Sequence, residues 1–168
     1  MQLLFLGTGA GDFLAGEDPA NQDEHVFRAR ELGGRNLRFA SQTLVDSDIL
    51  IDFYSDRQIS LLDVDASRIK HLLITHCHWD HFQPERILAF ATGRPHPLQI
   101  YGNETAEVGL EFAASNRWDP DRKRFTARSD DAHYAFRGIR PGETVNVADV
   151  RVTAVLANHH VDFERRIV

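Results

Sequence analysis

The amino-acid sequence predicts an α/β protein. Apolar, β-branched runs alternate along the chain with segments whose apolar residues recur every three or four positions, which is the pattern of strands followed by helices. Two of the apolar runs, residues 71–75 and 150–156, end abruptly in histidine-rich sequence. The length of 168 residues is enough for a buried core, so we expect a single domain over residues 1–168.

Composition and charge narrow the class of protein. Apolar residues make up 42% of the chain and charged residues 26%, which is ordinary for a globular protein. A net charge of −6 does not indicate a nucleic-acid or anionic-membrane partner. Cys77 is the single cysteine, which excludes an internal disulfide framework and a cysteine-rich zinc module. Because no apolar stretch approaches the roughly 18 residues of a membrane span and residues 2–6 are too short for a signal-peptide core, we expect a cytoplasmic protein without a membrane partner.

The first elements are a strand and a glycine-rich turn. Residues 2–6 predict a strand, and Gly7-Thr8-Gly9-Ala10-Gly11 follows it. Neither a Gly-Lys-Ser/Thr sequence nor a helical pattern comes next, which argues against a nucleotide-binding loop. We interpret the glycines as a tight turn that brings the backbone near the histidine-rich site. Residues 12–34 are polar without a sustained period and predict a long loop.

Two strands follow this loop, at residues 37–45 and 49–53, with a turn at residues 46–48. Asp52 comes at the end of the second strand. Its carboxylate either orients a metal-ligating imidazole or is simply the polar end of the strand, and the sequence leaves both interpretations open.

Helix signals appear at three places. Residues 55–58 predict a capping box, with Ile59 and Leu62 on the inner face of the helix that it begins. Pro84 suits the first position of a second helix, and Asn103 is a typical cap for a third. The remaining predicted strands are residues 98–101, 132–139, 145–147 and 150–156.

Residues 115–131 are dense in charge and also contain Trp118 and Phe125. One interpretation is a basic, aromatic patch that contacts RNA or a phosphate ester. Aspartates neutralise much of the positive charge, so we favour a solvated loop. The cationic residues of this segment are Arg117, Arg122, Lys123, Arg124 and Arg128.

The segment His76-Cys77-His78-Trp79-Asp80-His81 carries the chemistry of the chain. Three imidazoles and a carboxylate within six residues are too compact for one face of a helix or a strand, but they fit a loop that folds back on itself. Imidazole nitrogen suits zinc and related transition metals, and a carboxylate extends the set towards a second, harder ion. The sequence therefore predicts a metal site directly after a buried strand.

The pattern His-x-His-x-Asp-His resembles the metallo-β-lactamase superfamily, and His76, His78, Asp80 and His81 match each of its fixed positions. Residues 1–11, residues 35–38 with Ser41, and residues 49–52 resemble the branch that contains tRNase Z and the phosphonate-pathway phosphodiesterases. This resemblance implies an αββα sandwich. Because such proteins continue through a second αβ half, the chain resembles the first two-thirds of the domain, as a fragment of a longer hydrolase or as a naturally short protein.

The resemblance also implies roles for the ligands. His76, His78 and a third histidine, His159 with His160 as the alternative, would hold one zinc ion and leave a position for water. Asp80 and His81 would begin a second metal position, and Asp80 would also orient the hydroxide that the metal generates. We expect one or two zinc ions, with manganese or iron as alternatives.

We therefore expect a metal-dependent hydrolase that cleaves a small-molecule or nucleotide phosphodiester, or an RNA end. His78 stands where the iron-binding, oxygen-reducing relatives carry an acidic residue, which favours hydrolysis over redox chemistry. A homodimer would complete the second metal site if that site lies across a subunit interface. The alternative is a non-catalytic metal-binding or interaction protein that holds half a site.

Overall fold

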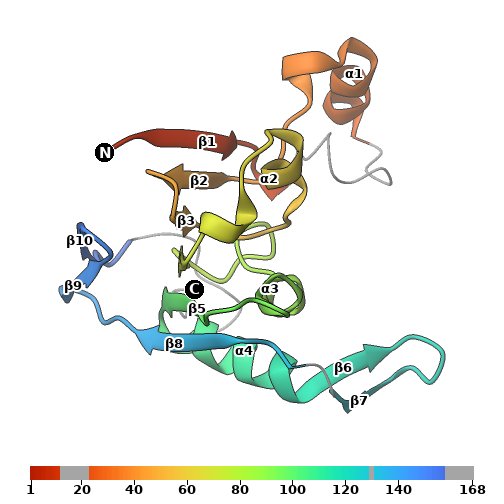
Figure 1. Ribbon diagram of the computed structural model, residues 1–168. Coiled ribbons are helices and arrows are strands. Elements are labelled where there is room, and N and C mark those ends of the chain that lie inside the picture. Colours follow the sequence, from red (N-terminus) through yellow and green to blue (C-terminus); the bar gives the residue numbers. More distant parts are fainter. Residues whose placement is uncertain (12–22, 129–130, 158–168) are drawn as a thin grey trace.

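The computed structural model describes residues 1–11, 23–128 and 131–157, and its centre is a six-stranded sheet (Figure 1). Across the sheet, the first two pairs of neighbouring strands are antiparallel, and the next three pairs are parallel. In spatial order the strands are β1 (Leu3–Gly7), β2 (Gln42–Val45), β3 (Ile49–Ile51), β4 (His71–Leu73), β5 (Leu98–Gly102) and β8 (Tyr134–Gly138).

Helices cover one face of this sheet. Alternation along the strands turns Leu50, Leu72 and Ile100 towards them, and these side chains are fully buried in the larger apolar cluster. Burial of this layer from water is the main source of stability for the parallel strands. The covering helices are α2 (Arg57–Leu61), α3 (Pro84–Ala91) and α4 (Glu104–Ser115).

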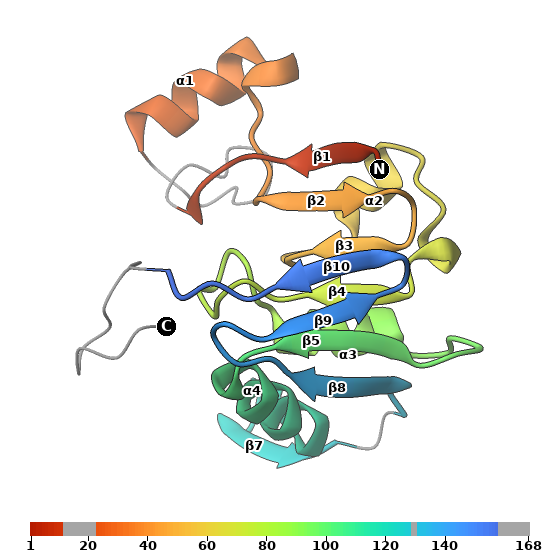
Figure 2. The same ribbon diagram turned by 90° about the vertical axis from the view of Figure 1, so that its left-hand side faces the viewer.

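A β-hairpin covers the opposite face. Its strands are β9 (Thr144–Val147) and β10 (Val150–Thr153), which pair antiparallel and cross in front of the sheet in Figure 2. Leu73 and Tyr101 face Val147 across this second apolar cluster. Helices, main sheet and hairpin thus form successive layers, which confirms the predicted α/β class. Within the described part of the chain, no helix is long and apolar enough to span a membrane.

The predicted loop at residues 12–34 contains a helix, so that prediction was wrong for its second half. Helix α1 (Glu24–Leu32) begins at Asp23, whose carboxylate accepts the N–H groups of His25 and Val26. Val26 is the buried residue of this helix. An apolar period could not reveal α1, because the helix is held by its cap and by a single buried side chain. A 3₁₀ turn at Gly34–Asn36 follows it, and another at Ala66–Arg68 precedes β4.

The helix predicted to begin at residues 55–58 is α2, and it begins one residue later than the predicted cap at Ser55 implies. Asp56 precedes α2 and makes no capping bond through its side chain. The two residues of the predicted capping box contact each other: the Ser55 hydroxyl donates to the Gln58 side-chain oxygen, at 2.8 Å, and both residues are buried. Ile59 packs into the core as predicted, whereas Leu62 is 49% exposed because the short helix ends at Leu61.

Residues 115–131 were predicted as a solvated loop, but most of them form a two-stranded ribbon. Strands β6 (Asn116–Asp119) and β7 (Arg124–Ala127) pair antiparallel and project from the end of α4 (Figure 1). Trp118 and Phe125 face each other across the ribbon. This aromatic pair supplies the cross-strand contact that a charge-dense sequence alone did not indicate.

Candidate metal centre

Strand β4 delivers the histidine-rich loop to the carboxyl edge of the parallel strands. The N–H groups of His81 and Phe82 both donate to the carbonyl of His78, at 3.0 and 2.9 Å, which reverses the chain. The reversal brings the imidazole rings together: the ring centroid of His76 lies 4.6 Å from that of His78 and 4.1 Å from that of His81. Asp80 is buried, and its Oδ2 lies 3.4 Å from His81 Nε2. Four of the five predicted ligands thus share one cluster.

Asp52, at the end of the neighbouring strand β3, anchors the cluster. Its carboxylate is 4% exposed and lies 2.7 Å from His81 Nδ1. It also accepts the backbone N–H of Thr75, at 2.8 Å, and the Thr75 hydroxyl, at 2.8 and 2.9 Å from its two oxygens. Asp52 has a φ of 60°, a conformation rare outside glycine that these bonds hold in place. Of the two interpretations open from the sequence, the structure supports the carboxylate that orients an imidazole.

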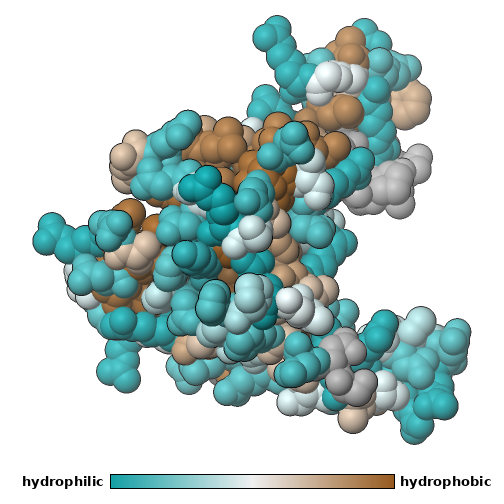
Figure 3. Space-filling model, in the orientation of Figure 1, coloured by the Kyte–Doolittle hydropathy of each residue, from teal (hydrophilic) through white to brown (hydrophobic). Residues whose placement is uncertain are grey.

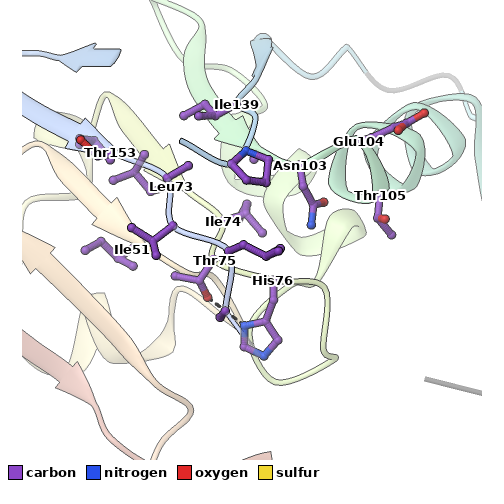
Figure 4. Close-up of a pocket in the computed structure, with 17 residues that line it drawn as sticks. Ile51, Leu73, Ile74, Thr75, His76, Asn103, Glu104, Thr105, Ile139 and Thr153 are labelled. Carbon is purple, nitrogen blue, oxygen red and sulfur yellow. Dashed lines mark hydrogen bonds between the residues drawn. The ribbon is translucent and has the colours of Figure 1, made fainter. Parts of the chain in front are cut away.

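These hydrogen bonds also fix where the imidazole protons lie. The Thr75 hydroxyl has one proton, and the carboxylate of Asp52 can only accept. The hydroxyl therefore accepts from His76 Nδ1, 2.9 Å away, so His76 carries its proton on Nδ1 (Figure 4). By the same reasoning His81 donates from Nδ1 to Asp52. In the neutral form of each ring, Nε2 then carries the lone pair that a metal ion needs.

The geometry offers two carboxylates as ligands. Atoms of Asp52, His76 and His81 that could bind a metal all lie within 4.8 Å of one another. However, both oxygens of Asp52 already accept hydrogen bonds from Thr75 or His81. If Asp52 turned to bind an ion, these bonds would break and the His81 imidazole would lose its anchor. We therefore assign Asp52 to orienting the ligands, with Asp80 as the carboxylate available to an ion. Imidazoles with a buried carboxylate are a donor set that fits zinc.

Burial by itself lowers the pKa of His81, but Asp52 and Asp80 reverse that effect. The hydrogen bond to Asp52, the charge of Asp52 and the charge of Asp80 together raise this pKa above its ordinary value. The two carboxylates thus create a negative electrostatic potential around the His81 ring. A metal ion bound at Nε2 would displace the proton that this environment favours.

Thr75 is the member of the site that the sequence analysis missed. It links Asp52 to His76 through one hydroxyl, and it is the residue directly before the metal motif. A hydroxyl side chain next to the first histidine was the available signal.

Cys77 points away from the metal cluster. Its Sγ lies 3.6 Å from Asn103 Oδ1, and its side chain packs against the larger apolar core. Burial, followed by the charge of Asp52, raises the pKa of the thiol to about 11. A neutral thiol is a poor metal ligand, and both its position and its pKa therefore argue against Cys77 as a ligand.

We expect Cys77 to react slowly with iodoacetamide at pH 8, ~100-fold more slowly than the same residue in urea-unfolded chain, because its pKa of about 11 lowers the thiolate fraction. The rate should rise with pH until the pH exceeds that pKa. Intact-protein mass spectrometry measures the labelling. Fast labelling at pH 8 that added zinc suppresses would instead identify Cys77 as a thiolate ligand.

The glycine-rich turn packs against the metal loop. A Cβ built on Gly11 would lie 2.9 Å from the ring of Trp79 and 3.1 Å from Cγ of Asp80. The predicted approach of this backbone segment to the metal site is thereby confirmed. At Gly7 a Cβ would collide with the carbonyl oxygen of Ala40, so the absence of a side chain lets β1 approach the segment that leads into β2.

A cavity of about 700 Å³ opens beside His76 (Figure 4). It lies at the carboxyl ends of the parallel strands, where Leu73 and Asn103 line it. Ala157, the last described residue of the segment after β10, lines the same cavity. The next predicted ligands, His159 and His160, lie outside the described residues.

Comparison with known proteins identifies the architecture. No family model matches the chain. The chain is similar to a ribonuclease Z from Methanocaldococcus jannaschii, 29% identical over 114 residues, which are 66% of this chain and 31% of that protein. Among solved structures, a diphosphatase of the PhnP family superposes with a TM-score of 0.55, at 18% identity, over 89% of this chain and 54% of that one. The fold is that of the metallo-β-lactamases.

A subclass B3 metallo-β-lactamase also aligns with 70% of the chain and 46% of its own length, at 23% identity and a TM-score of 0.44. The predicted resemblance to the metallo-β-lactamase superfamily, including its tRNase Z and phosphonate-pathway branch, is confirmed. The chain spans about a third of the length of the ribonuclease Z and about half of the diphosphatase. The described residues form a helical layer, a six-stranded main sheet and a hairpin packed on the other face of that sheet.

Proposed function

We propose that the chain supplies the metal-binding part of a metal-dependent hydrolase that cleaves phosphodiesters. The observation that carries this proposal is the cluster of His76, His81 and Asp80, in which hydrogen bonds hold the imidazole protons on Nδ1 and leave Nε2 for an ion. Similarity to a protein named ribonuclease Z and a fold shared with a PhnP-family diphosphatase support hydrolysis of phosphate esters or anhydrides.

The proposed ligand set divides between two positions. His76 and His78 hold the first ion with His159, and Asp80 and His81 begin the second. His76 and Ala157 line one cavity, and His159 follows Ala157 by two residues, a reach of at most about 7 Å of extended chain. His159 is the proposed third ligand, with His160 as the alternative.

The remaining residues position these ligands. Asp52 and Thr75 hold the imidazole rings in one orientation and one tautomer, which lowers the entropy cost of binding an ion. When bound, zinc or a related ion would act as a Lewis acid and lower the pKa of a water molecule to about 7. Asp80, a buried carboxylate at the edge of the cluster, would orient that water towards the phosphorus.

Several finer features belong to the same proposal. Zinc is the proposed metal, with manganese and iron as alternatives, and the number of ions is one or two. The proposed substrate is a small-molecule or nucleotide phosphodiester or RNA, the proposed compartment is the cytoplasm, and a homodimer would complete the second metal site.

His78→Ala tests the proposal through metal content and hydrolysis together. We expect the purified chain to contain bound metal, measured by plasma mass spectrometry, and to hydrolyse bis(p-nitrophenyl) phosphate. His78→Ala should lower the metal content and reduce hydrolysis by at least about 100-fold, because the ion that stabilises the negative charge of the transition state is lost.

His96→Ala is the matched control, because His96 is an exposed histidine outside the cluster and its loss should change neither quantity. Circular dichroism confirms that both variants keep the fold. A metal-loaded chain without hydrolysis would favour the non-catalytic metal-binding protein. Equal metal content in His78→Ala and the parent would contradict the proposed ligand set.

A further inference from the structure

The β6–β7 ribbon has two chemically different faces. Trp118 and Phe125 pair across the strands, with ring centroids 5.2 Å apart, and Phe125 lies 5.0 Å from Phe112 of α4. These aromatic contacts fix the register of the ribbon and anchor it to the helix. Because side chains alternate along a strand, the neighbours of the aromatic pair point to the opposite face.

The opposite face carries arginine. Arg117 and Arg124 belong to the alternate positions, and they lie diagonally across the two strands, a spacing of about 7–8 Å. Arg122 joins them at the turn, where it pairs with Asp119 at 3.6 Å. We call Arg117, Arg122 and Arg124 the arginine face, and all three are exposed.

The acidic residue on this face is already engaged. Asp119 accepts the backbone N–H groups of Asp121 and Arg122, both at 3.0 Å, so its carboxylate closes the turn between the strands. Across the ribbon and its turn, residues 116–127, four cationic and two acidic side chains give a net charge of +2, in a chain of net charge −6. Figure 3 shows hydrophilic side chains over the projecting ribbon. Such a local reversal of charge favours a polyanion as partner.

Helix α4 connects the ribbon to the metal loop and sets the distance between them. Helix α4 begins beside that loop, where its cap Asn103 contacts Cys77, and it ends at the ribbon. Its 12 residues span about 18 Å. At a stacked spacing of about 3.4 Å per nucleotide, about five nucleotides of a single strand would cover this distance.

We propose that the arginine face binds the phosphate backbone of a single-stranded RNA whose end lies at the metal loop. The inference rests on the proposed function for the reaction, but the binding itself requires no hydrolysis. Guanidinium groups suit phosphate because they are always charged and donate two hydrogen bonds in a plane. The ribbon would thus direct the enzyme towards polynucleotides rather than small cyclic phosphodiesters.

The test is fluorescence anisotropy with a labelled oligouridylate of about 15 nucleotides, a length within the range that single-strand binding surfaces cover. Arg117→Gln/Arg124→Gln should weaken binding at least about tenfold and reduce the slope of log affinity against log salt by about 1.4, because two phosphate contacts are lost. The control Lys70→Gln/Arg151→Gln removes the same charge from exposed sites elsewhere and should leave the slope unchanged.

Two further measurements separate this inference from the proposed function. Hydrolysis of bis(p-nitrophenyl) phosphate should be the same in the ribbon variant and the parent, since the aryl ester does not reach the ribbon. If the parent chain binds RNA but does not hydrolyse the aryl ester, the proposed phosphodiesterase function is rejected, and the assignment of the ribbon as an RNA-binding surface still stands. Equal RNA binding by the ribbon variant and the control would overturn the assignment, as would equally tight binding of polyglutamate, which would identify a surface for acidic protein.

Discussion

Replacement of Asp52 with alanine should lower the free energy of unfolding by about 3–5 kcal/mol and weaken metal binding about 10–100-fold. The buried carboxylate accepts bonds from the Thr75 backbone, the Thr75 hydroxyl and His81 Nδ1. Its loss leaves these partly buried donors without acceptors and lets both imidazole rings rotate. Urea denaturation measures the first effect, and titration of the chelator-treated protein with zinc measures the second.

Asp56→Ala is the control for this change, because Asp56 is exposed and makes no capping bond through its side chain. Asp52→Asn keeps the shape but places an amide NH₂ against one of the donors, so we expect it to recover little of the lost stability. A variant Asp52→Ala with parental stability and zinc affinity would show that the hydrogen-bonded cluster does not organise the site.

The interaction between Asp52 and His81 also has a defined pH dependence in the metal-free protein. The pKa of folded His81 is raised above the ordinary value of about 6.5 that applies to the unfolded chain. Its stabilising contribution is therefore fully present below about pH 6.5 and is lost as the pH rises through the raised folded value. The stability difference between the parent and Asp52→Ala should narrow over that interval.

Leu72→Ala should lower the free energy of unfolding by about 2–5 kcal/mol. Leu72 lies at the middle of β4, between two parallel neighbours, and is 1% exposed in the cluster beneath the helices. The truncation removes buried apolar surface and leaves a cavity in a layer that cannot close, because paired strands flank it on both sides. Since β4 leads directly into the metal loop, we expect zinc affinity to fall as well.

Leu61→Ala is the matched comparison for Leu72→Ala. Leu61 is 58% exposed at the end of α2, so its truncation should change stability by less than about 0.5 kcal/mol. Urea denaturation midpoints of the two variants give the difference. Similar midpoints would mean that the apolar layer around β4 contributes far less than its burial implies.

The sequence by itself determined the fold class and predicted which residues form the candidate metal site. Alternating strand and helix patterns predicted the α/β layers, and Pro84 and Asn103 marked helices that the structure contains. The motif from His76 to His81 indicated a metal site because ligand identity and close spacing are local properties. Each of these signals lies within a few residues, where the period and the chemistry of the side chains are sufficient.

Tertiary structure decided the features that depend on distant pairing. Asp52 and His81 are 29 positions apart, and their contact exists because β3 and β4 run parallel and end at the same edge. The arginine face likewise required the pairing of β6 with β7, without which the same residues look like a neutralised loop. A sequence pattern records which side chains are present and how they repeat. The strand pairing, which spans tens of residues, decides which of them meet.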